Sequence, residues 1–184
     1  MNKNDFIAKK NLLRNQNSNP DICEDRQGRK YTFEWIDKCP FDSILKLRNA
    51  ESVLQFMVDK NKITLGQHSK FIGTYSSRPR LDFMIREDLT NQYVAGVNIK
   101  LTDIGLELGK YIGNSEFLGC GLGIAMTNSF LYFIKTNYIN LLKEITVYAR
   151  TMSTNVGNIN LNKKIGFKIV KRLDEEYVLM KKVL

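Results

Sequence analysis

The sequence predicts a mixed α/β fold in which a mostly antiparallel sheet contains two parallel central strands and has helices on both faces. Three short apolar runs between residues 81 and 112 are separated by polar turns, which is typical of an antiparallel meander. The last run is followed by a glycine-rich turn, an amphipathic helix and a further apolar run at 144–150. Because a helix connects these two runs, we expect the two strands that they form to be parallel.

The composition is that of an ordinary globular protein. The chain has 184 residues, of which 43% are hydrophobic and three are proline, and this length is enough for one domain with a core. Residues 1–30 are rich in asparagine, lysine, arginine, aspartate and glutamine. We therefore expect a polar N-terminal extension with weak structure of its own, followed by a single domain over residues 31–184.

The elements ahead of the meander follow from periodicity and from helix caps. Aromatic and β-branched residues at 31–36 alternate enough to predict a first strand. Helical spacing at 42–49, with Asp42 or Ser43 as the cap, predicts a first helix. A second helix is expected at 64–75, where the threonine at its start can act as the cap.

From residue 81 onward, strands and helices alternate. The expected strands cover residues 81–85, 93–101, 106–112, 144–150, 167–172 and 176–181, with the last two joined around Asp174 and Glu175. The expected helices cover residues 121–135 and 155–164. In the longer helix Leu122, Met126, Phe130 and Phe133 lie three or four residues apart, a stripe that we interpret as part of the core.

The glycine turn is the feature most informative about function. Gly119, Gly121 and Gly123 alternate with Cys120 and Leu122 just ahead of the amphipathic helix. Each glycine would cost about 1 kcal/mol relative to alanine in a regular element, so the three belong to a turn. Unpaired N–H groups and the positive end of a helix dipole bind anions such as phosphate. The alternative is a turn that only changes the direction of the chain.

Two other phosphate motifs do not fit this turn. No lysine followed by serine or threonine stands at the spacing of a P-loop, and no βαβ unit follows as in a dinucleotide fingerprint. A second motif lies further along the chain and reads Asn155-Val-Gly-Asn-Ile-Asn-Leu-Asn-Lys-Lys-Ile-Gly166-Phe167.

Together, the two motifs resemble those of the GNAT superfamily of acyl-CoA-dependent N-acyltransferases. The family's loop Arg/Gln-x-x-Gly-x-Gly/Ala falls on Leu118, Gly121 and Gly123. Its later helix, Asn-x-x-Ala-x-x-Leu-Tyr-x-x-x-Gly-Phe, falls on Asn155, Asn158, Leu161, Asn162, Gly166 and Phe167. The resemblance implies a sheet splayed between its two parallel strands, and acetyl-CoA as co-substrate. Leu118 and Asn162 depart from the family, which commonly has a basic or amide residue and a tyrosine there.

The resemblance also implies which residues bind the cofactor. Backbone N–H groups of the turn would bind the pyrophosphate, the strand ending at Ile112 would contact the pantetheine arm, and the asparagine that opens the later helix would reach that arm. The implied residues are Tyr111, Ile112, Leu118, Gly119, Cys120, Gly121, Leu122, Gly123 and Asn155. Tyr111 is equally interpretable as an aromatic residue packed on a sheet, and Asn155 as a simple helix cap.

The catalytic residues are less clearly indicated. Asn162 has no proton to give as a general acid near neutral pH, although it could bind the sulfur or a water, and Tyr148 is the alternative hydroxyl, or merely structural. Glu107 is the leading base because it lies on the strand that would carry the thioester. The alternatives are His68, the sole histidine, which suits proton transfer but equally suits packing, and a water chain.

The acceptor is predicted only loosely. The segment that contains Arg48, Met57 and His68 is similar to the amino-terminal half of two GNAT branches, one acting on nucleotide-linked amino sugars and one on ribosomal-protein amino termini. A basic cleft suits a diphosphate, so we expect Arg48 and Met57 to contact a nucleotide-linked amino sugar. A GNAT-like protein that binds CoA without turnover is the non-enzymatic alternative.

Charge and cysteine content limit the partners. The net charge of +9 favours anionic ligands, but the basic residues are scattered and do not indicate nucleic-acid binding. Three widely spaced cysteines suit reduced thiols, and no Cys/His grouping has zinc spacing, so we expect no metal. The apolar runs are too short to span a membrane and the start lacks a signal-peptide segment, so we expect a cytoplasmic protein without a membrane partner. A homodimer is left open.

Overall fold

A computed structural model describes residues 2–141, 144–173 and 175–184. Its centre is one eight-stranded sheet with the order β1-β2-β3-β4-β5-β6-β8-β7. The strands are β1 (Cys23–Glu24), β2 (Lys30–Trp35), β3 (Arg80–Glu87), β4 (Tyr93–Thr102), β5 (Gly105–Ile112), β6 (Thr146–Met152), β7 (Lys168–Leu173) and β8 (Tyr177–Val183). The mixed, mostly antiparallel sheet predicted from the sequence is confirmed. In the turn between β7 and β8, Asp174 lies outside the described residues.

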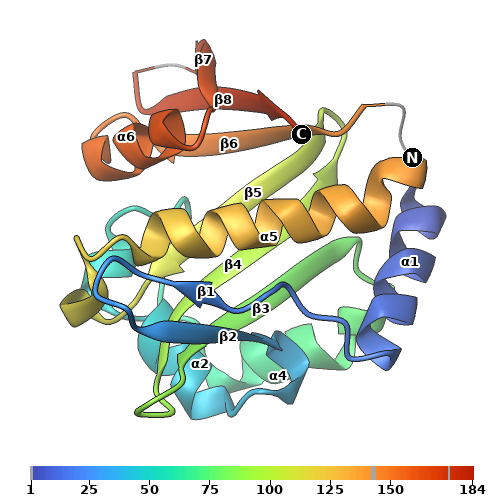
Figure 1. Ribbon diagram of the computed structural model, residues 1–184, viewed down its shortest axis with the longest axis horizontal. Helices are drawn as coiled ribbons and strands as arrows, with labels where there is room; N and C mark the ends of the chain where they lie inside the picture. The colour runs from blue at the N-terminus through green and yellow to red at the C-terminus, as the bar shows by residue number, and fades with distance from the viewer. Residues whose placement is uncertain (1, 142–143, 174) are drawn as a thin grey trace.

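The sheet is splayed at its one parallel pair. Strands β5 and β6 pair only at Leu106 with Val147 and at Glu107 with Tyr148, and beyond these pairs the two strands diverge (Figure 1). All other neighbouring strands are antiparallel, and β3, β4 and β5 form the predicted meander. The open end of the splay lies next to α6 (Val156–Lys164), which follows β6 (Figure 1).

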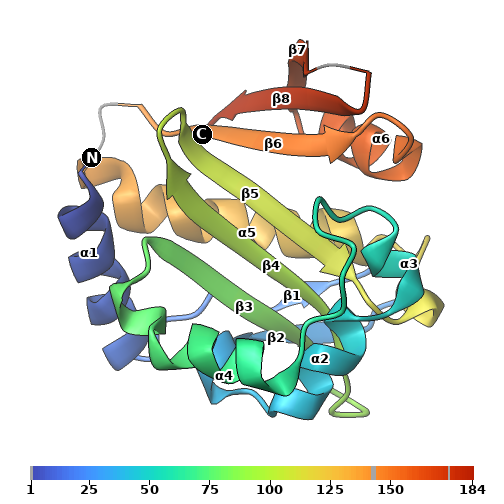
Figure 2. The same cartoon turned by 180° about the vertical axis from the view of Figure 1, so that it is seen from behind.

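Helices cover both faces of the sheet. The long helix α5 (Leu122–Tyr138) crosses one face, and α2 (Phe41–Arg48) and α4 (Leu65–Gly73) lie on the other face (Figures 1 and 2). The short α3 (Glu51–Leu54), which the sequence pattern did not indicate, follows α2. No helix among the described residues is long and apolar enough to cross a membrane.

The predicted apolar stripe of α5 is confirmed as core. Leu122, Met126, Phe130 and Phe133 are all buried. The rings of Phe130 and Phe133 meet Phe83 of β3 edge-on, with ring centroids 5.9 and 5.8 Å apart. These contacts fix α5 against the centre of the sheet, and therefore fix the position of the glycine turn from which the helix starts.

The expectation of weak structure before residue 31 is wrong. Lys3–Asn15 forms helix α1, in which Phe6 and Leu13 are buried. The ring of Phe6 stacks on Tyr138 at the end of α5, 5.1 Å between centroids. Lys10 is also buried, and its ammonium group donates to the carbonyl oxygen of Arg78 at 2.8 Å and to that of Tyr75. The polar composition gave the wrong prediction because a lysine can be buried in the core when carbonyl oxygens accept its hydrogen bonds.

Helix caps were predicted correctly at one helix and wrongly at another. Thr64 forms a capping box with Gln67 at the start of α4, as expected. Helix α2 instead begins at Phe41, with Pro40 at its cap position and no side-chain hydrogen bond there. Asp42 and Ser43 consequently lie inside the first turn and are not caps, because the fixed φ of proline has already set the start of the helix.

Candidate functional site

The glycine turn has the conformation that an anion site requires. Gly119 and Gly121 adopt positive φ angles of 78° and 99°, and Gly121 is the residue before the first turn of α5. Among the described residues, the backbone N–H groups of residues 119–123 have no hydrogen-bond acceptor. This row of unpaired donors at the start of a seventeen-residue helix is suited to binding phosphate oxygens.

Close packing explains why two of the glycines are needed. A Cβ at Gly121 would lie 2.9 Å from Cγ of Arg26, and a Cβ at Gly123 would lie 2.5 Å from Cδ1 of Leu161 on α6. The absence of a side chain at Gly123 thus lets α6 approach the start of α5. Cys120 points inward and donates its thiol to the carbonyl of Phe117 at 3.0 Å, so its contribution to the turn is backbone.

Arg26 belongs to this turn in space but was not indicated by the sequence. It lies in the hairpin between β1 and β2, and its backbone N–H donates to the carbonyl of Cys120 at 2.9 Å. Its side chain is exposed and packs over Gly121. At the head of the loop Leu118 is exposed and uncharged. The positive charge next to the turn therefore comes from a distant segment, and no local motif around Arg26 could have signalled this.

The predicted strand residues lie at the splay on opposite faces of β5. Glu107 and Tyr111 share the face covered by α2 and α4, and Leu106 and Leu108 face the core on the other side. The hydroxyl of Tyr111 contacts the sulfur of Met84 at 3.6 Å, so its ring packs across the sheet toward β3. Ile112 is partly buried at the end of the strand. The side chain of Ile112 lies on the α5 side, with its Cδ1 3.8 Å from the position that a Cβ would take at Gly123.

Glu107 is held in an ion-pair cluster. Its carboxylate lies 3.2 Å from Nζ of Lys100 and 3.8 Å from Arg150. Both cations thus lie close to the one carboxylate on this face of β5 that could accept a proton from an amine. Tyr148 pairs with Glu107 across the strands, but its ring packs against Gly105, 3.1 Å from the position a Cβ would take. Tyr148 thus lies toward the closed end of the splay, away from the diverging strands.

The two asparagines of α6 have distinct structural roles. Asn155 caps the helix by accepting from the N–H of Asn158 at 3.0 Å. Asn162 is fully buried, and its amide nitrogen donates to Oγ1 of Thr151 at 3.4 Å. Its amide oxygen accepts from Nζ of Lys110 at 2.6 Å. The helix-cap interpretation of Asn155 is therefore correct, whatever further contact it makes.

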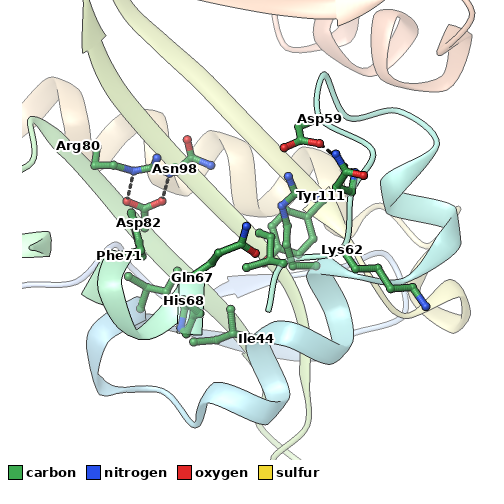
Figure 3. Close-up of a pocket in the computed structure, with 14 residues that line it drawn as sticks. Ile44, Asp59, Lys62, Gln67, His68, Phe71, Arg80, Asp82, Asn98 and Tyr111 are labelled. Carbon is green, nitrogen blue, oxygen red and sulfur yellow. Dashed lines mark hydrogen bonds and ion pairs between the residues drawn. The ribbon is translucent and has the colours of Figure 1, made fainter. Parts of the chain in front are cut away.

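A cavity of about 390 Å³ lies on the face that carries Glu107. Its lining comes from the 3-10 turn after β2, from α2, the segment after α3, α4 and strands β3, β4 and β5 (Figure 3): Ile36, Ile44, Arg48, Asp59, Asn61, Lys62, Ile63, Gln67, His68, Phe71, Arg80, Asp82, Asn98 and Tyr111. Asn98 pairs with Gly109, and the next pair on this face is Lys100 with Glu107. Glu107 is therefore roughly 7 Å further along the strand from the cavity wall.

Two nitrogens in the cavity wall are buried without a hydrogen-bond partner among the described residues, Nη1 of Arg48 and Nε2 of His68. Burial lowers the pKa of both side chains. His68 is 4% exposed and meets the ring edge of Phe41 at 4.9 Å, which matches a packing role. Arg80 pairs with Asp82 (Figure 3), so its charge is already balanced, whereas Arg48 forms no ion pair with any residue that the structure describes.

Met57 does not line the cavity. It lies in a turn after α3, with its N–H donating to the carbonyl of Leu54 at 3.0 Å. The neighbouring residues 59 and 61–63 line the cavity instead. The residues that line the cavity thus come after Met57, in the segment that follows the unpredicted α3.

Solved structures of acetyltransferases have the same architecture. Spermidine N-acetyltransferase from Vibrio cholerae, in complex with CoA and spermine, matches with a TM-score of 0.72 at 15% identity, over 83% of this chain and 95% of the other. The GNAT domain of S. lividans PAT matches with 0.69 at 10% identity, over 89% and 96%. An aminoglycoside acetyltransferase in complex with coenzyme A matches with 0.64 at 14% identity, over 83% and 94%.

The chain has the GNAT fold. No protein-family model matches the sequence, and no curated protein matches it. The GNAT resemblance predicted from the glycine turn and the Asn155 motif is therefore confirmed at the level of fold, and the splay between β5 and β6 is the feature that the resemblance implied.

Proposed function

We propose that the protein is an acetyl-CoA-dependent N-acetyltransferase. The observation that carries the proposal is the glycine turn, where five successive backbone N–H groups without acceptors among the described residues stand at the start of α5, beside the diverging strands β5 and β6. The solved neighbours that share this fold include acetyltransferases in complex with CoA. Unpaired donors, missing Cβ atoms and the adjacent Arg26 all fit a pyrophosphate group.

The residues divide into a donor side and an acceptor side. The turn and Arg26 would hold the phosphates of acetyl-CoA, which supplies the acetyl group as an activated thioester, and the backbone of β5 up to Ile112 would line the pantetheine arm. The acceptor amine would enter from the cavity below α2 and α4. Glu107, on the cavity face and paired with Lys100 and Arg150, would take the proton that the attacking nitrogen loses.

For the acceptor we propose a primary amine that carries an anionic group, with a nucleotide-linked amino sugar as the candidate. The support is Arg48, whose buried and unpaired Nη1 calls for an oxygen acceptor on the ligand. A volume of about 390 Å³ accommodates a sugar-sized group, with a nucleotide left outside. The solved neighbours include a spermidine N-acetyltransferase with spermine bound and an aminoglycoside acetyltransferase, and spermine and aminoglycosides are amines without such a group. A protein amino terminus is the alternative acceptor.

The test is a screen of amines with acetyl-CoA that records release of free thiol. Nucleotide-linked amino sugars, their free amino sugars, spermidine, an aminoglycoside and peptides with free amino termini are compared in parallel. We expect transfer to the nucleotide-linked sugars, weakened by salt because charges are screened over about 8 Å at physiological ionic strength. Acetylation of peptides alone would favour the alternative acceptor, and binding of CoA without transfer to any amine would favour a non-enzymatic CoA-binding protein. Sedimentation velocity would decide between a monomer and the homodimer that the sequence leaves open.

A further inference from the structure

Lys110 is a partly buried lysine at the splay that the proposed mechanism leaves unused. It lies on β5 beyond the last residues that pair with β6, and alternation puts its side chain on the face opposite Glu107. Its ammonium nitrogen donates to Oδ1 of Asn162 on α6 at 2.6 Å. The side chain thus reaches from one diverging strand to the helix that follows the other.

The surroundings of this ammonium group contain no counter-charge. Lys110 forms no ion pair with a carboxylate among the described residues, and the other hydrogen bonds given for the Asn162 side chain go to Thr151 and Met180. No charged group of β5, β6, β8 or α6 contributes to the shift, and burial alone lowers the pKa of Lys110 to about 7. If this side chain served packing alone, methionine or leucine would be more favourable, because a desolvated cation without a counter-charge destabilises the fold.

We propose that Lys110 is the catalytic acid that protonates the sulfur of CoA as it leaves, with Asn162 as its positioning residue. The inference rests on the proposed acetyl transfer. It follows from placement: Glu107 is in the last pair that joins β5 to β6, and Lys110 lies further along β5, on the opposite face, where the two strands have diverged. A thioester in that opening would meet the acceptor amine and base from one side and the ammonium from the other.

The step balances in atoms and protons. The nitrogen of the amine forms a bond to the carbonyl carbon, and the C–S bond breaks with its electron pair moving to sulfur. The ammonium of Lys110 gives one proton to that sulfur, and the nitrogen loses one proton to Glu107 or water. Lys110 then regains a proton from solvent, which a group with a pKa of about 7 does readily near neutral pH.

The test measures the thiol pKa of bound CoA, which requires no acceptor. CoA is added to the protein, and ultraviolet thiolate absorbance is titrated against pH, with the desulfo-CoA complex subtracted to remove the protein's own cysteines. We expect the pKa of the bound thiol to be at least about one unit lower in the wild type than in Lys110→Met, because the ammonium favours the thiolate. Lys110→Arg keeps the charge and should keep the low thiol pKa.

Turnover separates proton donation from charge. With any amine that the screen identifies, Lys110→Arg should lower kcat about 100-fold, because a guanidinium does not give up its proton, and should abolish the fall of the rate above pH 7. Asn162→Ala should raise the bound thiol pKa partly. The control Lys171→Met removes an exposed lysine of β7 and should leave the thiol pKa unchanged.

The outcomes are distinguishable. Failure of CoA to bind the wild type would refute the proposed acetyltransferase function itself. Normal CoA binding with the same thiol pKa in the wild type and Lys110→Met would overturn the role of Lys110 alone. A low thiol pKa that survives in Lys110→Met and is lost in Tyr148→Phe would assign the acid to Tyr148.

Discussion

The glycine turn and the acceptor cavity are built in different ways. The turn presents backbone N–H groups from five consecutive residues, and its shape depends on glycines at positive φ. The cavity presents side chains from three strands, two α-helices, the 3-10 turn after β2 and the segment after α3, and its unsatisfied atoms belong to Arg48 and His68. A site made of backbone groups therefore depends on local sequence, whereas a site made of side chains depends on how distant elements pack.

The largest effect that we expect is the loss of acetyl-CoA binding in Gly121→Val. A side chain there meets Arg26 and must adopt a φ of 99°, which costs a non-glycine residue about 1–2 kcal/mol. Acetyl-CoA at 100 times its dissociation constant should stabilise the wild type by about 2.7 kcal/mol, and this stabilisation should vanish in the variant.

Thermal unfolding with and without acetyl-CoA measures the effect of Gly121→Val. The control is Gly66→Val in α4, where no atom lies within 4 Å of the added Cβ, and it should keep the full shift. An unchanged shift in Gly121→Val would remove the glycine turn from the cofactor site.

The second effect belongs to the cavity. Arg48→Met removes the unpaired guanidinium nitrogen, and we expect kcat/KM for a nucleotide-linked amino sugar to fall about 10- to 100-fold, as for loss of a charge-assisted hydrogen bond. The shift produced by acetyl-CoA should persist, because the turn lies elsewhere. Lys46→Met on the exposed side of α2 is the matched control. Equal losses for charged and uncharged amines would contradict an anion-binding role for Arg48.

The smallest effect is expected at the exposed edge of the cofactor site. Arg26→Met should weaken CoA binding about two- to fivefold, because a solvent-exposed ion pair contributes up to about 1 kcal/mol. Isothermal titration at low and high salt measures it, and the difference between wild type and variant should shrink at high salt. Lys30→Met, on the neighbouring strand, should bind CoA like the wild type. A loss that is independent of salt would argue against a charge interaction.

Local signals carried most of the fold prediction. The apolar runs that form β3, β4 and β5, the cap at Thr64 and the stripe of α5 each depend on residues near one another in the chain, and each was confirmed. The prediction failed at α1, where a polar composition conceals the few residues that pack inward. Composition averages over all faces of a helix, while burial selects only one of them.

The site residues, too, could be predicted only where they are close together in the sequence. The backbone donors of the glycine turn were readable because they are contiguous, but Arg26 reaches Gly121 only through the β1–β2 hairpin. The hydrogen bond between Lys110 and Asn162 likewise joins two elements, β5 and α6, and no pattern in the sequence indicates it. Met57 was misplaced for a related reason, since α3 redirects the loop that follows α2.

The short pairing between β5 and β6 has a mechanical consequence. Strands β5 and β6 are joined by two residue pairs. The block formed by β6, β8, β7 and α6 is attached to the rest of the sheet through these pairs and through the contact of Leu161 with the start of α5. Such a block can open as a unit at a lower free energy than global unfolding. Amide hydrogen exchange in β6 and α6 should therefore be faster than in β3 and β4. A ligand bound between β5 and β6 should slow this exchange, because it contacts both strands and disfavours their separation.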